Sequence, residues 1–130
     1  MAPAGAPRRR QRLTRSGDFD RVFRQGTSRG NRFLVLYAFP RGESPEGEGG
    51  PRLGVSVGRK VGGAVERNAV KRALREAFWS LPGYEDEARD FVVVARPDAA
   101  GLVEREGTAG VSDALRELLE DSGTDPGRST

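Results

Sequence analysis

The chain has 130 residues, of which 35% are hydrophobic and 32% are charged, a size and balance that fit one domain with one core. It contains no cysteine and no histidine, which excludes disulfides and thiolate zinc sites and removes the commonest general base near neutral pH. No apolar run is long enough to span a bilayer, and residues 1–12 have no apolar stretch behind their basic residues. We therefore expect a soluble cytoplasmic protein with no catalytic group of its own.

The net charge of +3 conceals an uneven distribution along the chain. Residues 1–32 contain nine arginines against two acids, and residues 52–76 contain seven lysines and arginines against two acids. Residues 77–130, in contrast, contain twelve acids against five arginines. Because the basic residues are confined to two blocks, the sequence predicts a localised site for a polyanion.

The N-terminal part predicts a basic arm and then a short helix. Residues 1–11 are rich in Ala, Pro and Arg and lack apolar periodicity, so we expect them to be disordered. Ser16 is a suitable N-cap for a helix over 18–25, with acids in the first turn and Gly26 as its stop. Three apolar side chains share one face of this helix, and that face needs a surface to pack against. They are Phe19, Val22 and Phe23.

Two strands are predicted next. Residues 33–39 are apolar throughout, rich in aromatics and followed by Pro40, which favours a strand buried on much of both faces. A Gly/Pro/Glu-rich loop over 41–51 leads to residues 53–58, which alternate strictly. This alternation places three small residues, Gly54, Ser56 and Gly58, on one face. Such a face either lets a helix or ligand approach closely or is simply exposed to solvent.

The second half of the chain predicts a helix, a strand and a helix. Residues 66–81 carry an apolar stripe at helical spacing, and residues 91–95 form a β-branched run suited to a buried strand. A final helix is expected to begin near Ser112, and a polar, disordered tail is expected over 121–130. The order of elements predicts one α+β domain over residues 12–120, with a sheet covered by helices. Three strands are clear, and a fourth is expected from residues 29–39 or from the loop.

The central basic block combines features that suit a nucleic-acid backbone. Arg59 and Lys60 lie in a Gly-rich approach to a helix N-terminus, where free N–H groups and the helix dipole favour a phosphate. Arg67, Lys71 and Arg75 then recur every four residues along one side of the helix. The full basic and polar side contains Arg67, Asn68, Lys71, Arg72 and Arg75. Arginine offers planar, multi-donor hydrogen bonding to phosphate and stacks on bases, which favours RNA over a small anion.

The alternative is a solvated helix face whose cations pair with acids. Within the block only Glu66 and Glu76 are available, so at least five positive charges lack a local partner. Acids from the last third of the chain remain possible partners. RNA binding is nevertheless the favoured interpretation of this block.

A long, spaced motif carries a family resemblance. It consists of Arg59-Lys60-Val61-Gly62, Ala64-Val65, Arg67-Asn68, Lys71-Arg72 and Arg75-Glu76. Similarity extends beyond this motif, because the segments before it fall in the family's order, and together they cover about residues 12–96. These segments are Leu13-Thr14-Arg15, Gly26-Thr27-Ser28 and the two predicted strands. Together these segments resemble the bacterial ribonuclease P protein family. Ala69 stands where the family commonly has a basic residue, and Gly63 where it often has Asn.

The resemblance implies an α/β sandwich with a four-stranded sheet and a left-handed βαβ crossover. It also implies that a catalytic RNA, with magnesium bound mainly by that RNA, hydrolyses precursor tRNA, and that no membrane or further protein partner is required. The residues implied to bind the catalytic RNA are Arg59, Lys60, Arg67, Asn68, Lys71, Arg72 and Arg75. A cleft between the sheet and the first helix is implied to hold the single-stranded 5′ leader, through Phe19, Phe23 and Tyr37. An apolar helical trio that includes Phe19 and Phe23 is, however, more often part of a core.

Two other functions stay open. A ribosomal or RNA-chaperone protein of similar fold would use the same helix on its own RNA, and binding of a tRNA leader would distinguish the two. A protein-only, metal-dependent nuclease would need clustered carboxylates. The basic blocks contain only Asp18, Asp20, Glu66 and Glu76, and the last two lie too far apart on a straight helix to share one metal ion.

Overall fold

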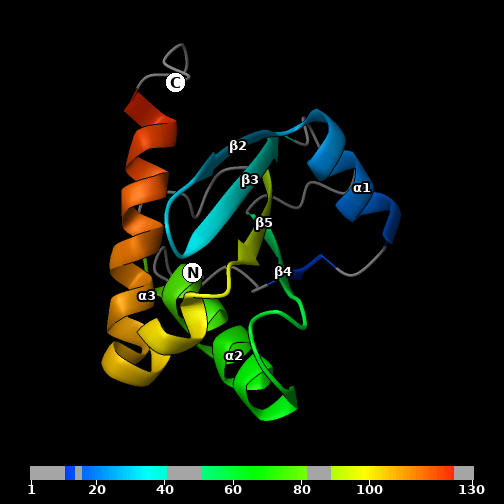
Figure 1. The fold of residues 1–130 in the computed structure, drawn as a ribbon. Coiled ribbons are helices and arrows are strands. Elements are labelled where there is room, and N and C mark those ends of the chain that lie inside the picture. The colour runs from blue at the N-terminus through cyan, green and yellow to red at the C-terminus, as the bar shows by residue number, and fades with distance from the viewer. Residues whose placement is uncertain (1–10, 14–15, 41–50, 82–88, 125–130) are drawn as a thin grey trace, which may run out of the picture.

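The computed structural model describes residues 11–13, 16–40, 51–81 and 89–124 (Figure 1). The expected N-terminal arm except Gln11, the loop over 41–50 and residues 125–130 lie outside these ranges. In chain order the elements are β1 (Gln11–Arg12), α1 (Ser16–Gln25), β2 (Thr27–Gly30), β3 (Leu34–Pro40), β4 (Arg52–Val57), α2 (Ala64–Ser80), β5 (Arg89–Ala95) and α3 (Ala99–Thr124).

The strands form one mixed sheet in the order β1-β4-β5-β3-β2. β4 and β5 are parallel neighbours connected through α2, while β3 is antiparallel to both β5 and β2. Four strands carry the sheet, and the two-residue β1 extends it along β4 in parallel. The predicted α+β class, with helices covering a sheet, is confirmed.

The fourth strand is β2, which forms a hairpin with β3. Its register pairs Thr27 with Ala38 and Gly30 with Val35. Asn31 stabilises the turn of this hairpin, because its Oδ1 accepts hydrogen bonds from the N–H groups of Phe33 and Leu34, both at 3.0 Å. Its Nδ2 donates to the carbonyl of Ala114 on α3 at 3.1 Å. The fourth strand therefore comes from a division near residues 29–39, one of the two expected alternatives, although β2 begins two residues earlier, at Thr27.

The main core lies between the sheet and the layer formed by α2 and α3. Alternate residues of the strands point into it, as the period of two in a strand requires. The rings of Phe78 on α2 and Phe91 on β5 lie 5.2 Å apart, centroid to centroid, and both side chains are buried. Figure 1 shows α1 on the opposite side of the sheet from α2 and α3.

A smaller apolar cluster lies beneath α1. Its buried members are Leu13, Val22 and Val92, and Phe19, Tyr37, Phe39 and Val94 pack around them. Gly54 makes this packing possible, because a Cβ at that position would lie 2.5 Å from the Cζ of Phe19. The small residue on β4 thus admits a helix close to the sheet, whereas Gly58 has no such neighbour within 4 Å.

Two helix boundaries differ from those expected. α2 begins at Ala64, two residues earlier than predicted, and the Oε1 of Glu66 accepts the N–H of the N-cap Gly63 at 3.0 Å. The expected start of the final helix near Ser112 is wrong, since α3 begins at Ala99. Gly107 interrupts it with a positive φ of 65°, and this glycine obscures the helical period in the sequence. α3 also runs to Thr124, into the segment 121–130 expected to be a tail.

Candidate RNA interface

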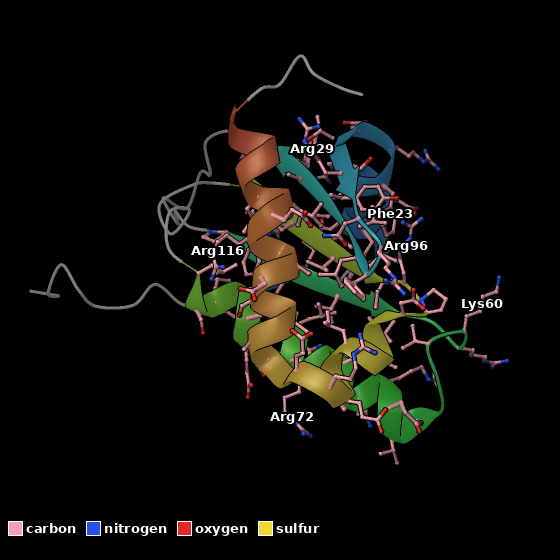
Figure 2. The ribbon with its side chains drawn as sticks, turned by 60° about the vertical axis from the view of Figure 1, so that its left-hand side comes forward. Phe23, Arg29, Lys60, Arg72, Arg96 and Arg116 are labelled. Carbon is pink, nitrogen blue, oxygen red and sulfur yellow. The ribbon has the colours of Figure 1, made fainter. Side chains whose placement is uncertain are left out.

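The two faces of α2 have opposite character, because its apolar stripe is buried against the sheet and α3. The buried residues of the helix are Val70, Ala73, Leu74, Ala77 and Phe78. The residues expected to bind RNA occupy the other face, where Asn68 and Arg72 are exposed and Arg67, Lys71 and Arg75 are partly exposed. The structure therefore gathers all five on one accessible side of one helix, and Arg72 projects from α2 in Figure 2.

A hollow of about 460 Å³ lies between this side of α2 and the edge of the sheet. Its lining consists of Arg12, Leu53, Asn68, Lys71, Arg72, Arg75, Glu76 and Trp79. Arg12 reaches the hollow because β1 pairs with β4, which sets Arg12 opposite Leu53. The next residue, Leu13, donates its N–H to the carbonyl of Leu53 at 2.9 Å. Sequence analysis missed the contributions of Arg12 and Trp79 to this site.

The cations of the hollow, and Arg67 beside them on α2, lack acidic partners within the described ranges. None of Arg12, Arg67, Lys71, Arg72 and Arg75 takes part in an ion pair there. Burial, together with the nearby charge of Arg12, lowers the pKa of Arg75 from its ordinary value. The Nε of Arg67 is buried and has no hydrogen-bond partner among the described residues. Within the described residues, α2 is therefore not the helix of the alternative interpretation, in which the cations pair with acids.

Arg59 and Lys60 form the exposed turn that leads into α2. The turn is closed by the N–H of Val61, which donates to the carbonyl of Gly58 at 3.1 Å. Both cations are exposed, and Lys60 points outward in Figure 2. Glu66 already accepts one N–H at the helix N-terminus. The carboxylate of Glu66 therefore lies at the helix end where the sequence analysis expected a phosphate.

The three expected leader-binding aromatics lie together on the α1 side of the sheet. The rings of Phe19 and Phe23 are 6.2 Å apart, and those of Phe23 and Tyr37 are 4.8 Å apart in an edge-to-face arrangement. Phe23 is 39% exposed, whereas Val22 is fully buried. The helical trio is thus divided: Val22 belongs to the core, Phe19 packs on Gly54, and Phe23 presents an aromatic surface to solvent.

A buried ion network that sequence analysis missed joins α1 to the sheet. Asp90 is completely buried and accepts hydrogen bonds from the Nε and Nη2 of Arg52, both at 2.8 Å. The Nη1 of Arg52 also lies 3.7 Å from a carboxylate oxygen of Asp18 in the first turn of α1. The hydrogen bond with Asp90 raises the pKa of Arg52. Arg52 and Asp90 stand at the starts of two strands 38 positions apart, so only their pairing in the sheet brings them together.

The described ranges contain no group of three or more Asp, Glu, His or Cys residues arranged to hold a metal ion. No described helix is long and apolar enough to cross a membrane.

The fold and its surfaces define a class of protein. A helix face with five basic and polar side chains is exposed on one side of a mixed sheet, and an aromatic surface is exposed on the other. Cations without acidic partners suit phosphates, and accessible rings suit unpaired bases. These are the features of a small RNA-binding α+β protein.

Comparison with known proteins identifies the family. The family model described as Ribonuclease P matches residues 8–121. The chain is 37% identical over 110 residues to the ribonuclease P protein component of Shouchella clausii, covering 85% of this chain and 87% of that protein. It is 39% identical over 111 residues to the Streptococcus pyogenes protein of the same name, covering 84% of this chain and 88% of that one.

Solved structures agree with this assignment. The Staphylococcus aureus RNase P protein matches with a TM-score of 0.71 and 30% identity, over 88% of this chain and 97% of that one. The Thermotoga maritima RNase P protein matches with a TM-score of 0.70 and 32% identity, over 86% and 97%. The chain therefore belongs to the ribonuclease P protein family. Its function is that of a ribonuclease P subunit in tRNA processing, with catalysis on the RNA component.

Proposed function

We propose that this protein binds the catalytic RNA of ribonuclease P through the α2 side and the 5′ leader of precursor tRNA through the α1 side. The observation that carries the proposal is the basic face of α2, whose cations form no ion pair within the described part of the chain. By holding both RNAs, the protein promotes endonucleolytic 5′ maturation of tRNA. We assign this activity to the cytoplasm.

The α2 side neutralises phosphates that approach one another in the complex. Its proposed contacts are Arg59, Lys60, Arg67, Asn68, Lys71, Arg72 and Arg75. Positions four apart on a helix are separated by about 6 Å, close to the spacing of phosphates along an RNA strand. Arg67, Lys71 and Arg75 therefore suit successive phosphates, and Asn68 adds a neutral donor and acceptor.

The α1 side holds unpaired leader nucleotides by stacking. Phe23 is the exposed ring of the aromatic cluster, and the ring of Tyr37 packs on it in an edge-to-face contact. Phe19 holds the helix close to β4. Stacking on aromatic rings tolerates every base, so the leader is bound with little sequence preference.

Magnesium belongs, in this proposal, to the RNA component. The described side chains offer no three-ligand cluster for it, and no step is assigned to an ion on the protein. The contribution of the protein is to reduce repulsion between phosphates, which lowers the magnesium concentration that the RNA needs. No further protein partner is required.

Reconstitution tests the proposal. The protein is added to a bacterial ribonuclease P RNA, and cleavage of a precursor tRNA is measured at low magnesium. We expect the protein alone to be inactive and the mixture to cleave much faster than the RNA alone. Equal rates with and without the protein would contradict the proposal.

Leader binding separates this function from that of a ribosomal or RNA-chaperone protein. We expect the assembled complex to prefer precursor tRNA to mature tRNA in competition. A complex that binds both equally would favour the ribosomal or chaperone alternative, and cleavage by the protein without RNA would favour the protein-only nuclease.

A further inference from the structure

The hollow beside α2 contains an apolar floor as well as cations. Leu53, which is buried, and Trp79, which is partly buried, both line it. The indole of Trp79 packs edge-to-face on Phe78, with centroids 5.0 Å apart and planes at 88°. This contact fixes the orientation of the indole where it borders the hollow. Trp79 also packs against the main core, and the part of the indole that borders the hollow offers a fixed aromatic surface on which a base can stack.

The charges of the hollow favour an anion beside that ring. Arg12 comes from the sheet edge and Arg75 from the helix, and their mutual repulsion contributes to the lowered pKa of Arg75. An anion between the two guanidinium groups would relieve this repulsion. The one carboxylate of the lining belongs to Glu76, whose Oε1 accepts a hydrogen bond from the hydroxyl of Thr108 on α3 at 3.0 Å. Glu76 is thereby held to the α3 side.

The size of the hollow suits one nucleotide. Its volume of about 460 Å³ falls within the range of roughly 300–1,000 Å³ typical of pockets for small organic ligands. Asn68 supplies a donor and an acceptor of the kind that recognise the edge of a base. An aromatic ring, paired cations and an amide group together match an unpaired nucleotide more closely than a continuous helical backbone.

We infer that this hollow takes one unpaired nucleotide of a bound RNA strand, with its base against Trp79 and Leu53 and its phosphate between Arg12 and Arg75. The inference rests on the proposed function in so far as that strand belongs to the catalytic RNA. It adds a base-stacking contact to a surface otherwise assigned to phosphate neutralisation. The α2 side then binds a nucleotide that is unpaired and turned out of the RNA helix.

Trp79 supplies its own reporter, because it is the single tryptophan of the chain. The protein is titrated with two probes: single-stranded pentaadenylate, and a ribose-phosphate pentamer of the same charge without bases. We expect pentaadenylate to quench the tryptophan fluorescence strongly and the abasic pentamer to leave it nearly unchanged. The aromatic cluster at α1 lies on the other face of the sheet, so binding there does not produce this signal. Equal quenching by both probes would overturn the inference, as would quenching by neither.

Charge variants locate the phosphate. Arg12→Gln and Arg75→Gln should each weaken the quenching titration with pentaadenylate by roughly threefold to tenfold, because each removes one partner of the phosphate. Arg116→Gln is the matched control, since it removes the same charge from α3 outside the lining of the hollow. Equal weakening by all three variants would mean that general attraction, and not this site, holds the probe.

Ring variants test the stacking in the catalytic RNA complex. Trp79→Leu should lower affinity for the catalytic RNA by roughly fivefold to tenfold, in the lower part of the range for base–aromatic stacking. Trp79→Phe should restore most of that affinity. Neither variant should alter the slope of affinity against salt, because no charge changes. Unchanged affinity in Trp79→Leu would overturn the inference while the proposed function stands. Quenching by pentaadenylate without any binding of the catalytic RNA would instead retain the nucleotide site and overturn the proposed function.

Discussion

Arg52, beneath α1, and the arginines of the exposed face of α2 are used in opposite ways. On the α1 side, Arg52 is held between the buried Asp90 and the helix residue Asp18. On the α2 side, Arg67, Arg72 and their neighbours form no ion pair within the described residues. The contrast teaches that net charge is a poor guide to function. What matters is whether a guanidinium already has a carboxylate, since a satisfied cation stabilises the fold and an unsatisfied one is available to RNA.

This contrast predicts the largest effect at Arg52. Arg52→Leu removes two hydrogen bonds from a fully buried carboxylate and should lower the free energy of unfolding by roughly 3 kcal/mol. Urea denaturation measures the loss. The double variant Arg52→Leu with Asp90→Leu should recover much of it, because no charge is then left buried.

The matched control is Arg116→Leu. Arg116 pairs with Asp113 at 2.8 Å, but both side chains are exposed, so its replacement should cost less than about 1 kcal/mol. If Arg52→Leu were as mild as Arg116→Leu, the α1 side would not depend on its buried ion network.

The close approach of α1 to β4 predicts the next effect. Gly54→Ala places a Cβ against the ring of Phe19 and should lower the free energy of unfolding by about 1–3 kcal/mol, as overpacking does. Leader affinity should fall as well, because α1 must shift. Gly58→Ala, just beyond the end of β4 and with no neighbour within 4 Å of the added Cβ, is the control and should change neither quantity. Equal behaviour of the two variants would show that α1 is not held by this contact.

Phe23 is the exposed ring of the α1 side, and its loss should affect the binding of RNA rather than the fold. Phe23→Ala should weaken binding of precursor tRNA by about 1 kcal/mol, roughly the stacking of one base. Binding of mature tRNA, which lacks the leader, should be unchanged. Competition between the two ligands measures the difference. Equal losses for both would assign Phe23 to the core or to general RNA contact.

Features that depend on neighbouring positions in the chain could be predicted from the sequence, whereas contacts between distant positions could not. The stripe and the basic face of α2 are local patterns, so the helix and its exposed cations could be predicted within two residues. The Arg52–Asp90 pair could not, because its members are adjacent only after β4 and β5 align. Likewise, Arg12 enters the hollow through a two-residue strand that no periodicity could reveal.

The aromatic residues illustrate an intermediate case. Spacing correctly predicted that Phe19, Val22 and Phe23 share a face, but it could not say which of them is buried. That division depends on Gly54, which has no side chain and so leaves room for Phe19 to pack on the sheet. It also depends on the position of Tyr37 on β3, where its ring contacts that of Phe23. The start of α3 was predicted wrongly for a related reason: Ala99 and Leu102 are buried in the main core, and Gly107 breaks their register with the rest of the helix.

The smallest effect on stability is expected where the effect on RNA binding is clearest. Lys71 and Arg75 lie on the accessible side of α2, so Lys71→Gln and Arg75→Gln should each change the free energy of unfolding by no more than about 0.5 kcal/mol. When a phosphate contact is lost, RNA binding releases fewer counterions. The slope of log affinity against log salt should therefore become shallower by roughly 0.7 to 1 per variant. Affinity for the catalytic RNA, measured over a series of salt concentrations, gives this slope. Variants that unfold the protein, or that leave the slope unchanged, would mean that these cations serve the fold as Arg52 does, and the difference between the two sides of the sheet would disappear.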